Sequence, residues 1–177
     1  MNAGSESKPH EQSSGASTQV ERASERELVL RRVFRARPES VFAAMTEPEL
    51  LRRWWAPRAL GVELFECQAD ARVGGSYRFV FGRRGERSMA FSGIYREVVP
   101  GQRLVYTQIF EPMREAGEGL VSASFEKHPE GTLLVQRELY PSKEVLDGAI
   151  ASGMERGMRN TLEQLEALLK DLGDGGC

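Results

Sequence analysis

Apolar residues follow two different periods along this chain. Between about residue 27 and residue 139 they alternate with polar residues or fill short runs that end at Gly, Pro or Asp. In the segment from Tyr77 to Phe81 the three aromatic residues fall on one face, which is the period of two typical of a strand. From Lys143 to Lys170 apolar residues recur every three or four positions, which indicates one long amphipathic helix.

Turn and capping residues divide the first part of the chain into a strand and two short helices. The run 27–37 mixes β-branched and charged residues, as a half-exposed strand does, and Pro38 suits the first turn of a helix that ends at Met45. Thr46 is expected to cap a second short helix, because Glu49 stands at the capping-box spacing. Pro57 ends that element.

Short connections join the strand-like runs that follow. These runs are 62–69, 76–82, 88–99, 103–110, 120–128 and 132–139. Connections this short favour antiparallel hairpins over crossover units. Ser142 is the expected N-cap of the final helix and Gly173 its expected end. The element order predicts an α+β fold in which a curved antiparallel sheet wraps one long C-terminal helix, with a cavity between them.

Composition bounds the domain and its surroundings. Residues 1–26 are poor in large apolar side chains, so we expect a disordered tail, then one domain over 27–170 and a flexible tail over 171–177. A net charge of -2 gives no general attraction to nucleic acid, and no apolar run reaches the length of a membrane span. The N-terminus has no secretory h-region, and two cysteines, Cys67 and Cys177, fit a reducing cytoplasm.

Several local motifs, taken in order, carry a resemblance to a known family. They are Phe34-Arg-Ala-Arg-Pro-Glu-Ser-Val-Phe42, Met45-Thr-Glu-Pro-Glu-Leu50, Arg53-Trp-Trp-Ala-Pro57, Gly74-Gly-Ser-Tyr77, Gly93-Ile-Tyr-Arg-Glu-Val-Val-Pro100, Arg103-Leu-Val-Tyr-Thr107 and Gly131-Thr-Leu-Leu134. Together they resemble the START-like (SRPBCC) superfamily, and within it the family named for the C-terminal domain of the activator of heat-shock protein 90 ATPase.

That resemblance implies a helix-grip fold, like that of the birch-pollen allergen, with a hydrophobic cavity between the sheet and the long helix. It implies varied roles without a common catalytic set: small-molecule binding, resistance to toxic metabolites or chaperone regulation. The chain departs from the family pattern at Met158, where a Trp is common, and at Gln108, where an aromatic residue often stands.

Three groups of residues are candidates for the cavity wall, and each has an alternative structural role. Trp54 and Trp55 suit stacking on an aromatic ligand, or packing of a helix end on the sheet. Met154 and Met158 suit an adaptable pocket or a filled core. The polar strand residues either orient a ligand or face solvent, and the sequence leaves this open; they are Gln108, Gln136 and Glu138.

Catalytic and metal-binding patterns find little support in the sequence. His128 lies at a hairpin beside Pro129, away from any evident nucleophile, and His10 lies in the N-terminal tail with no partner for a metal. We expect no cofactor and no metal. The carboxylate-rich segment 111–118 is predicted to be a mobile loop that could cover the cavity.

The leading hypothesis is a non-catalytic or weakly catalytic binder of a small apolar, aromatic or lipid-like molecule. Its predicted wall comprises Trp54, Trp55, Tyr77, Phe79, Phe91, Tyr106, Gln108, Gln136, Met154 and Met158. One alternative is a co-chaperone that stimulates a chaperone ATPase. Another is a cyclase-like or hydrolase-like enzyme, which would need Glu138 or Tyr106 as an inward acid or base. A homodimer is a further open alternative.

Overall fold

One antiparallel sheet of eight strands forms most of the molecule, in a computed structural model that describes residues 17–174. The strand order across the sheet is β1-β2-β8-β7-β6-β5-β4-β3. The second strand, β2, therefore pairs with the last strand, β8. The strands are β1 (Gln19–Arg22), β2 (Glu27–Phe34), β3 (Glu63–Ala69), β4 (Ser76–Gly82), β5 (Met89–Val99), β6 (Arg103–Phe110), β7 (Gly119–His128) and β8 (Gly131–Leu139).

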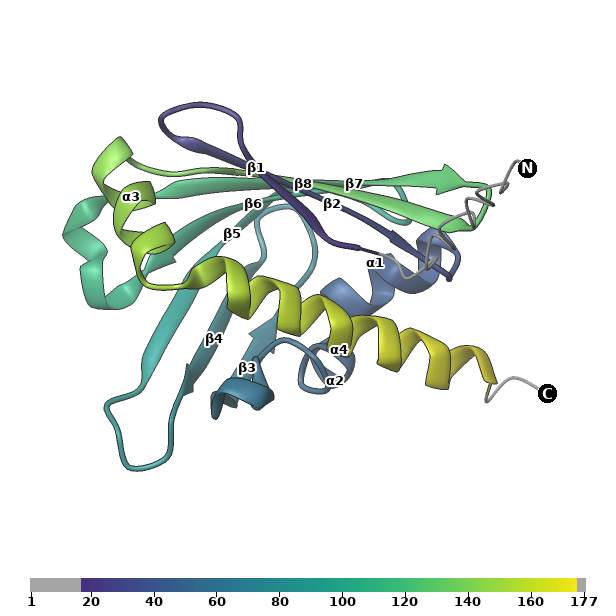
Figure 1. Cartoon of the computed structure of the whole chain (residues 1–177), viewed down its shortest axis with the longest axis horizontal. Coiled ribbons are helices and arrows are strands. Elements are labelled where there is room, and N and C mark those ends of the chain that lie inside the picture. Colours follow the sequence, from purple (N-terminus) through teal and green to yellow (C-terminus); the bar gives the residue numbers. More distant parts are fainter. Residues whose placement is uncertain (1–16, 175–177) are drawn as a thin grey trace, which may run out of the picture.

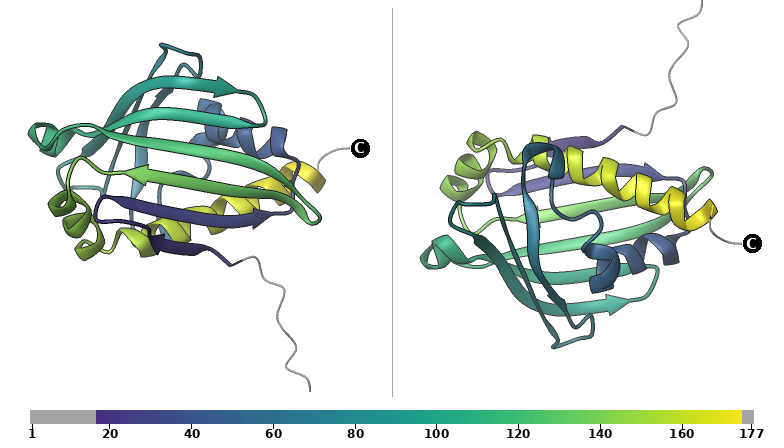
Figure 2. Two further views of the ribbon diagram at one scale, coloured as in Figure 1. Left: turned by 90° about the horizontal axis from the view of Figure 1, so that it is seen from above. Right: turned by 90° about the horizontal axis from the view of Figure 1, so that it is seen from below.

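The helices lie against the concave side and at the ends of this sheet. The short helices α1 (Pro38–Thr46) and α2 (Pro48–Leu51) follow β2, and the 3-10 turns are η1 (Arg58–Leu60) and η2 (Glu111–Ala116). The C-terminal helices are α3 (Lys143–Ala151) and α4 (Met154–Asp174). Figure 1 shows α4 running along one side of the curved sheet, and the right-hand view of Figure 2, from below, shows it crossing the concave face.

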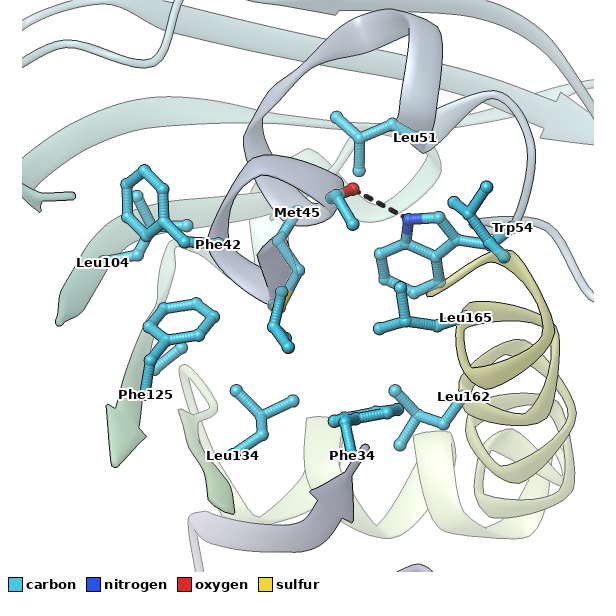
Figure 3. Close-up of a cluster of buried hydrophobic side chains, with 14 of the residues drawn as sticks. Phe34, Phe42, Met45, Leu51, Trp54, Leu104, Phe125, Leu134, Leu162 and Leu165 are labelled. Atoms are coloured by element: carbon cyan, nitrogen blue, oxygen red, sulfur yellow. Dashed lines mark hydrogen bonds between the residues drawn. The ribbon is translucent and has the colours of Figure 1, made fainter. Parts of the chain in front are cut away.

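Apolar side chains from the sheet, α1 and α4 form the core. Leu162 and Leu165 of α4 point toward Phe34 and Leu134 of the sheet, as Figure 3 shows. Phe34, Leu134 and Leu165 have no exposed surface. Burial on this scale stabilises a fold by roughly 1.5–3 kcal/mol per large side chain. The sheet and α4 therefore share one core, which confirms the predicted α+β helix-grip fold.

Trp54 connects the short helices to this core. Its Nε1–H donates to the carbonyl oxygen of Ala44 at 2.8 Å, the bond drawn in Figure 3. The residue four positions after Ala44 is Pro48, which has no N–H, so the indole supplies a donor that the helix itself cannot. Gln164 of α4 adds two bonds of 2.7 Å to the carbonyls of Trp54 and Ala56. These bonds hold the tryptophan segment against α4.

The N-terminal part of the chain differs from the expected disordered tail. Residues 19–22 form β1, which pairs with β2. Just before it, the hydroxyl of Thr18 accepts a 2.8 Å bond from the buried guanidinium of Arg32, and its carbonyl accepts one from Arg159 of α4. A buried cation needs partners, and composition gave no sign that these would come from the tail. Residues 1–16, with His10, lie outside the described residues, as does Cys177.

The C-terminal helix is also interrupted, where a single helix over 143–170 was expected. Ser142 caps α3 as predicted, its side chain accepting a bond from the amide of Val145. The helix then ends, and Gly153 adopts a φ of 83° before α4 starts. This left-handed conformation favours glycine and turns the chain, which the continuous apolar period concealed. At the other end α4 continues past Gly173 to Asp174.

The predicted capping box at Thr46 is wrong. Thr46 is the last residue of α1, and its hydroxyl donates to the carbonyl oxygen of Phe42 at 2.9 Å. Glu47 precedes α2 as its N-cap and makes no side-chain capping bond. A threonine hydroxyl can bond either forward to an amide or back to the carbonyl four residues earlier, and sequence spacing does not separate the two.

Candidate functional site

A cavity of about 70 Å³ lies at one end of the sheet. Strands β5 to β8 form its wall, η2 covers it, and the chain between β8 and α3 closes one side. Most of its lining is apolar, with three polar side chains among fourteen residues: Phe91, Gln108, Phe110, Met113, Ala116, Gly117, Gly119, Leu120, Val121, Glu138, Leu139, Tyr140, Pro141 and Val145. A mainly apolar lining with a few polar groups is typical of a small-molecule site.

Glu138 is the charged group of this cavity. One carboxylate oxygen accepts a 2.7 Å bond from Gln136 Nε2, and the other accepts a 2.8 Å bond from the hydroxyl of Tyr140. Burial raises the pKa of Glu138, while the hydrogen bonds from Tyr140 and Gln136 act in the opposite direction. The carboxyl group is therefore held in position by two neutral donors in surroundings that oppose its ionisation.

Two tyrosines, Tyr106 and Tyr140, lie near this carboxyl group. Burial, followed by the nearby charge of Glu138, raises the pKa of both Tyr106 and Tyr140. The Sδ atom of Met154 lies 2.9 Å from the Tyr140 hydroxyl. That hydroxyl has a single proton to donate. It donates its hydrogen bond to the carboxylate of Glu138, which is a stronger acceptor than the thioether sulfur of Met154. These phenols stay neutral near pH 7 and can donate or accept hydrogen bonds but cannot compensate the charge.

An ion pair fixes the start of η2 above the cavity. Arg78 of β4 donates to both oxygens of Glu111, each at 2.9 Å. The hydrogen bond from Arg78 holds the pKa of Glu111 below its usual value. Beyond this anchor, Met113, Ala116 and Gly117 line the cavity. The segment predicted to cover the cavity thus lies over it, as a short 3-10 turn; its mobility remains a prediction.

The break in the C-terminal helix positions the other side of the cavity. Because the chain turns at Gly153, α3 leaves the line of α4 and lies at the end of the sheet near η2 (Figure 1). Val145 of α3 contributes to the cavity lining. Arg22 pairs with Asp147 at 2.7 Å and so ties α3 to the hairpin of β1 and β2.

Five of the predicted wall residues gather at this cavity. Phe91 and Gln108 line it, and Gln136 and Met154 contact the groups that do. Tyr106 pairs with Val121 across β6 and β7 and packs against the rings of Tyr77 and Tyr95. The sequence left open whether Gln108 and Glu138 face inward or toward solvent. Both line the cavity, so both face inward.

The other five predicted wall residues lie in the core or beside it. Trp54, Tyr77 and Phe79 are buried, and the hydroxyl of Tyr77 donates to the carbonyl of Thr107 at 2.7 Å. Trp55 is partly buried against Phe79 and Phe91, with ring centroids 5.1 and 6.1 Å away. Met158 packs against the core cluster. Whether any of the ten residues contacts a ligand stays a prediction.

Tyr140 is the polar lining residue that sequence reasoning missed, and apolar lining residues such as Phe110 and Val145 were missed with it. Tyr140 follows the last strand and precedes Pro141, a position that suggests a connecting loop. Its backbone amide bonds to the carbonyl of Arg26, which keeps the segment against β2. The signal that could have found it is the spacing in Gln136-Arg-Glu-Leu-Tyr140, which puts every second residue on the cavity face.

Residues 17–174 contain neither a metal-ligand cluster nor a membrane-spanning helix. No group of three or more His, Cys, Asp or Glu side chains within residues 17–174 could hold a metal ion. In the same part of the chain, no helix has the length and apolar content needed to cross a bilayer. His128 accepts a bond from the amide of Glu130 in its hairpin.

The fold and its cavity define a helix-grip protein with a single described domain. A profile of the family described as "Activator of Hsp90 ATPase homolog 1-like protein" matches residues 35–170. The chain belongs to this family. The resemblance to the START-like superfamily that its motifs suggested is thereby confirmed.

Solved bacterial structures share this fold. A protein from Rhodobacter sphaeroides is 29% identical, with a TM-score of 0.81 over 88% of this chain and 99% of that chain. A protein from Chromobacterium violaceum is also 29% identical, with a TM-score of 0.72 over 82% of this chain and 98% of that chain. A protein from Nitrosomonas europaea, at 24% identity, has a TM-score of 0.74 over 85% of this chain and 98% of that chain. The comparison with curated proteins gave no match.

Proposed function

We propose that this protein binds a small molecule, mostly apolar and carrying one polar group, in the cavity beneath η2. The observation that supports this most is the placement of Glu138, Gln108 and Tyr140 in an otherwise apolar lining. Keeping a carboxyl group largely out of water is costly in a fold, so the position of Glu138 suggests a use there. Two neutral donors hold it in one orientation, as a group that orients a ligand should be held.

The cavity volume limits the ligand. About 70 Å³ accommodates a small group, whereas drug-sized ligands occupy roughly 300–1,000 Å³. A larger ligand would place one end in the cavity and would displace η2 or α3 with the rest. Both covers are short elements at the end of the sheet, so moving them leaves the core of sheet and α4 intact.

A thermal-shift screen of small apolar compounds with the full chain tests this proposal. We expect at least one compound to raise the melting temperature, and we expect Ala116→Trp, which fills the cavity from η2, to abolish that shift. Ala151→Trp is the matched control, because Ala151 is exposed on α3 and outside the lining. Equal loss of binding in both variants, or no binding compound at all, would count against the proposal.

A second candidate function is stimulation of a chaperone ATPase in the cytoplasm. The description of the family whose profile covers residues 35–170 supports it. An ATPase assay with purified Hsp90 and a saturating amount of this protein tests it directly. Increased turnover would support a co-chaperone, and an unchanged rate would leave small-molecule binding as the function. Analytical ultracentrifugation of this protein, without Hsp90, tests the homodimer alternative.

A further inference from the structure

The carboxyl group of the cavity has neutral partners. Glu138 accepts hydrogen bonds from an amide, Gln136, and a phenol, Tyr140, and neither carries a positive charge. Each carboxylate oxygen has two acceptor positions, so each keeps one after these bonds. No Lys, Arg or His forms a salt bridge with Glu138 within the part of the chain that the structure describes. Among residues 17–174 the negative charge of Glu138 therefore has no counter-ion.

Aromatic rings lie around the same cavity. Phe91, Phe110 and Tyr140 line it, and the ring centroids of Phe91 and Phe110 are 5.2 Å apart. The face of an aromatic ring attracts a cation, and it does so most strongly where water is excluded. The same rings give no such attraction to an anion. Carboxylate and rings therefore select for the same sign of charge.

Apolar side chains surround the mouth of the cavity. Met113 of η2 lines it and is still 47% exposed, and Ala116, Pro141 and Val145 line it and are half-buried. An exposed apolar side chain with half-buried apolar neighbours at the mouth of the cavity suits a molecule with an apolar part outside that cavity.

From these three features we propose that the ligand is an amine with an apolar tail, bound as its ammonium ion. The ammonium group lies between the carboxylate of Glu138 and the aromatic rings, and the tail covers Met113, Ala116 and Val145. This inference rests on the proposed binding function and adds the chemical class of the ligand. It also accounts for the small volume, because only the ammonium end must enter the cavity.

Three six-carbon compounds with different head groups test the inference: hexylamine, 1-hexanol and hexanoate. Titration calorimetry of the full chain at pH 8 keeps the amine protonated, since alkylammonium groups lose their proton near pH 10. We expect hexylamine to bind at least about tenfold more tightly than hexanol, and hexanoate to bind most weakly. Butylamine should bind more weakly than hexylamine, because it covers less of the apolar rim.

Glu138→Gln separates the charge from the shape of the site. We expect it to weaken hexylamine at least about tenfold and to leave hexanol within about twofold. Glu130→Gln, the matched control, removes an exposed carboxylate at the far end of β8 and should change neither affinity. Tyr140→Phe keeps the charge and removes one donor, so it should retain the preference for the amine and serves if Glu138→Gln fails to fold.

The outcomes distinguish the two proposals. Hexanol binding as tightly as hexylamine, or hexylamine binding unchanged by Glu138→Gln, would overturn the amine ligand and leave a neutral ligand in the same cavity. Failure of all the compounds to bind, together with no compound from the wider screen, would overturn both. Hexylamine binding that is lost equally in Glu130→Gln would show attraction to surface charge only, and would also overturn the amine site.

Discussion

Burial of the Glu138 carboxyl makes stability depend on pH. Because burial raises its pKa above the usual 4.5, the folded protein binds more protons than the unfolded chain as the pH rises above that value. Stability falls with pH wherever the folded state binds more protons, so this group's contribution is greatest below 4.5 and is lost as the pH rises through its folded pKa.

Glu138→Gln should remove that loss. We expect the variant to melt at a higher temperature than the wild type near pH 8, with the difference shrinking to near zero by about pH 4. Melting curves at intervals between these values measure it. Glu130→Gln should show a difference that does not vary with pH in this way. A constant difference for Glu138→Gln as well would contradict the buried-carboxyl argument.

Trp54 shows how a single residue can serve structure rather than binding. Its indole N–H bonds to the carbonyl of Ala44, whose normal helical donor position is occupied by Pro48. Trp54→Phe keeps much of the apolar contact and loses that bond. We expect the free energy of unfolding to fall by about 1–3 kcal/mol, measured by urea denaturation.

Trp55→Phe is the comparison for this prediction. Trp55 is partly buried and contacts Phe79 and Phe81 through its ring, a type of contact that phenylalanine can also make. Its substitution should cost less than that of Trp54. An equal loss in the two variants would mean that the hydrogen bond to Ala44 contributes little.

At the scale of elements, the turn between α3 and α4 decides the shape of the cavity. A straight helix would carry residues 143–151 along the line of α4, and Val145 would leave the cavity lining. The left-handed Gly153 makes the turn. Gly153 at the break and Gly148 inside α3 therefore have different roles, although the apolar period runs past both.

Substituting each glycine by alanine reveals this difference. A Cβ at Gly153 meets no atom within 4 Å, so Gly153→Ala costs only the strain of a positive φ, roughly 1–2 kcal/mol. Gly148 lies inside α3 with equally open space, so Gly148→Ala should stabilise by roughly 0.5–1 kcal/mol. Thermal unfolding of both variants gives the signs. Stabilisation by Gly153→Ala would indicate that the two helices join in solution.

At the scale of the whole molecule, the N-terminal strand completes the sheet. It covers one edge of β2. Thr18, the residue before this strand, accepts a hydrogen bond from Arg32, and burial lowers the pKa of the Arg32 guanidinium. A buried guanidinium that loses a partner destabilises the fold, and an uncovered edge strand is prone to pair with another chain.

Two truncations locate the start of the domain. Removing residues 1–22 should lower the melting temperature by about 2–8 °C and should promote association seen by size-exclusion chromatography. Removing only residues 1–16 should change neither. Equal stability of both truncated chains would support the boundary at residue 26 that composition predicts.

Much of the fold could be predicted because it depends on local patterns. Alternation and turn residues located the seven strands from Glu27 onward, and the family motifs supplied their arrangement. β1 escaped prediction because its four residues are mostly exposed, so its stability comes from pairing with β2 rather than from its own apolar side chains. The Gly153 break escaped because both helices keep one apolar period.

The candidate site could be predicted only in part, because a cavity joins residues that are distant in the chain. Gln108, Gln136 and Glu138 stood out as polar residues on apolar strands, but their direction depends on strand register. Tyr140 belongs with them only because β8 leads the chain past β2 to α3.

The sequence by itself determined the strands from Glu27 onward, their order and the family, since each follows from short-range periodicity and from motifs along the chain. The tertiary structure decided which polar residues share a cavity and what surrounds them. Registry between β6, β7 and β8 puts Gln108 and Glu138 inward, and the turn at Gly153 brings α3 across the end of the sheet. Burial then raises the pKa of the Glu138 carboxyl group, and the surroundings that bury it form only when distant segments of the chain pack together.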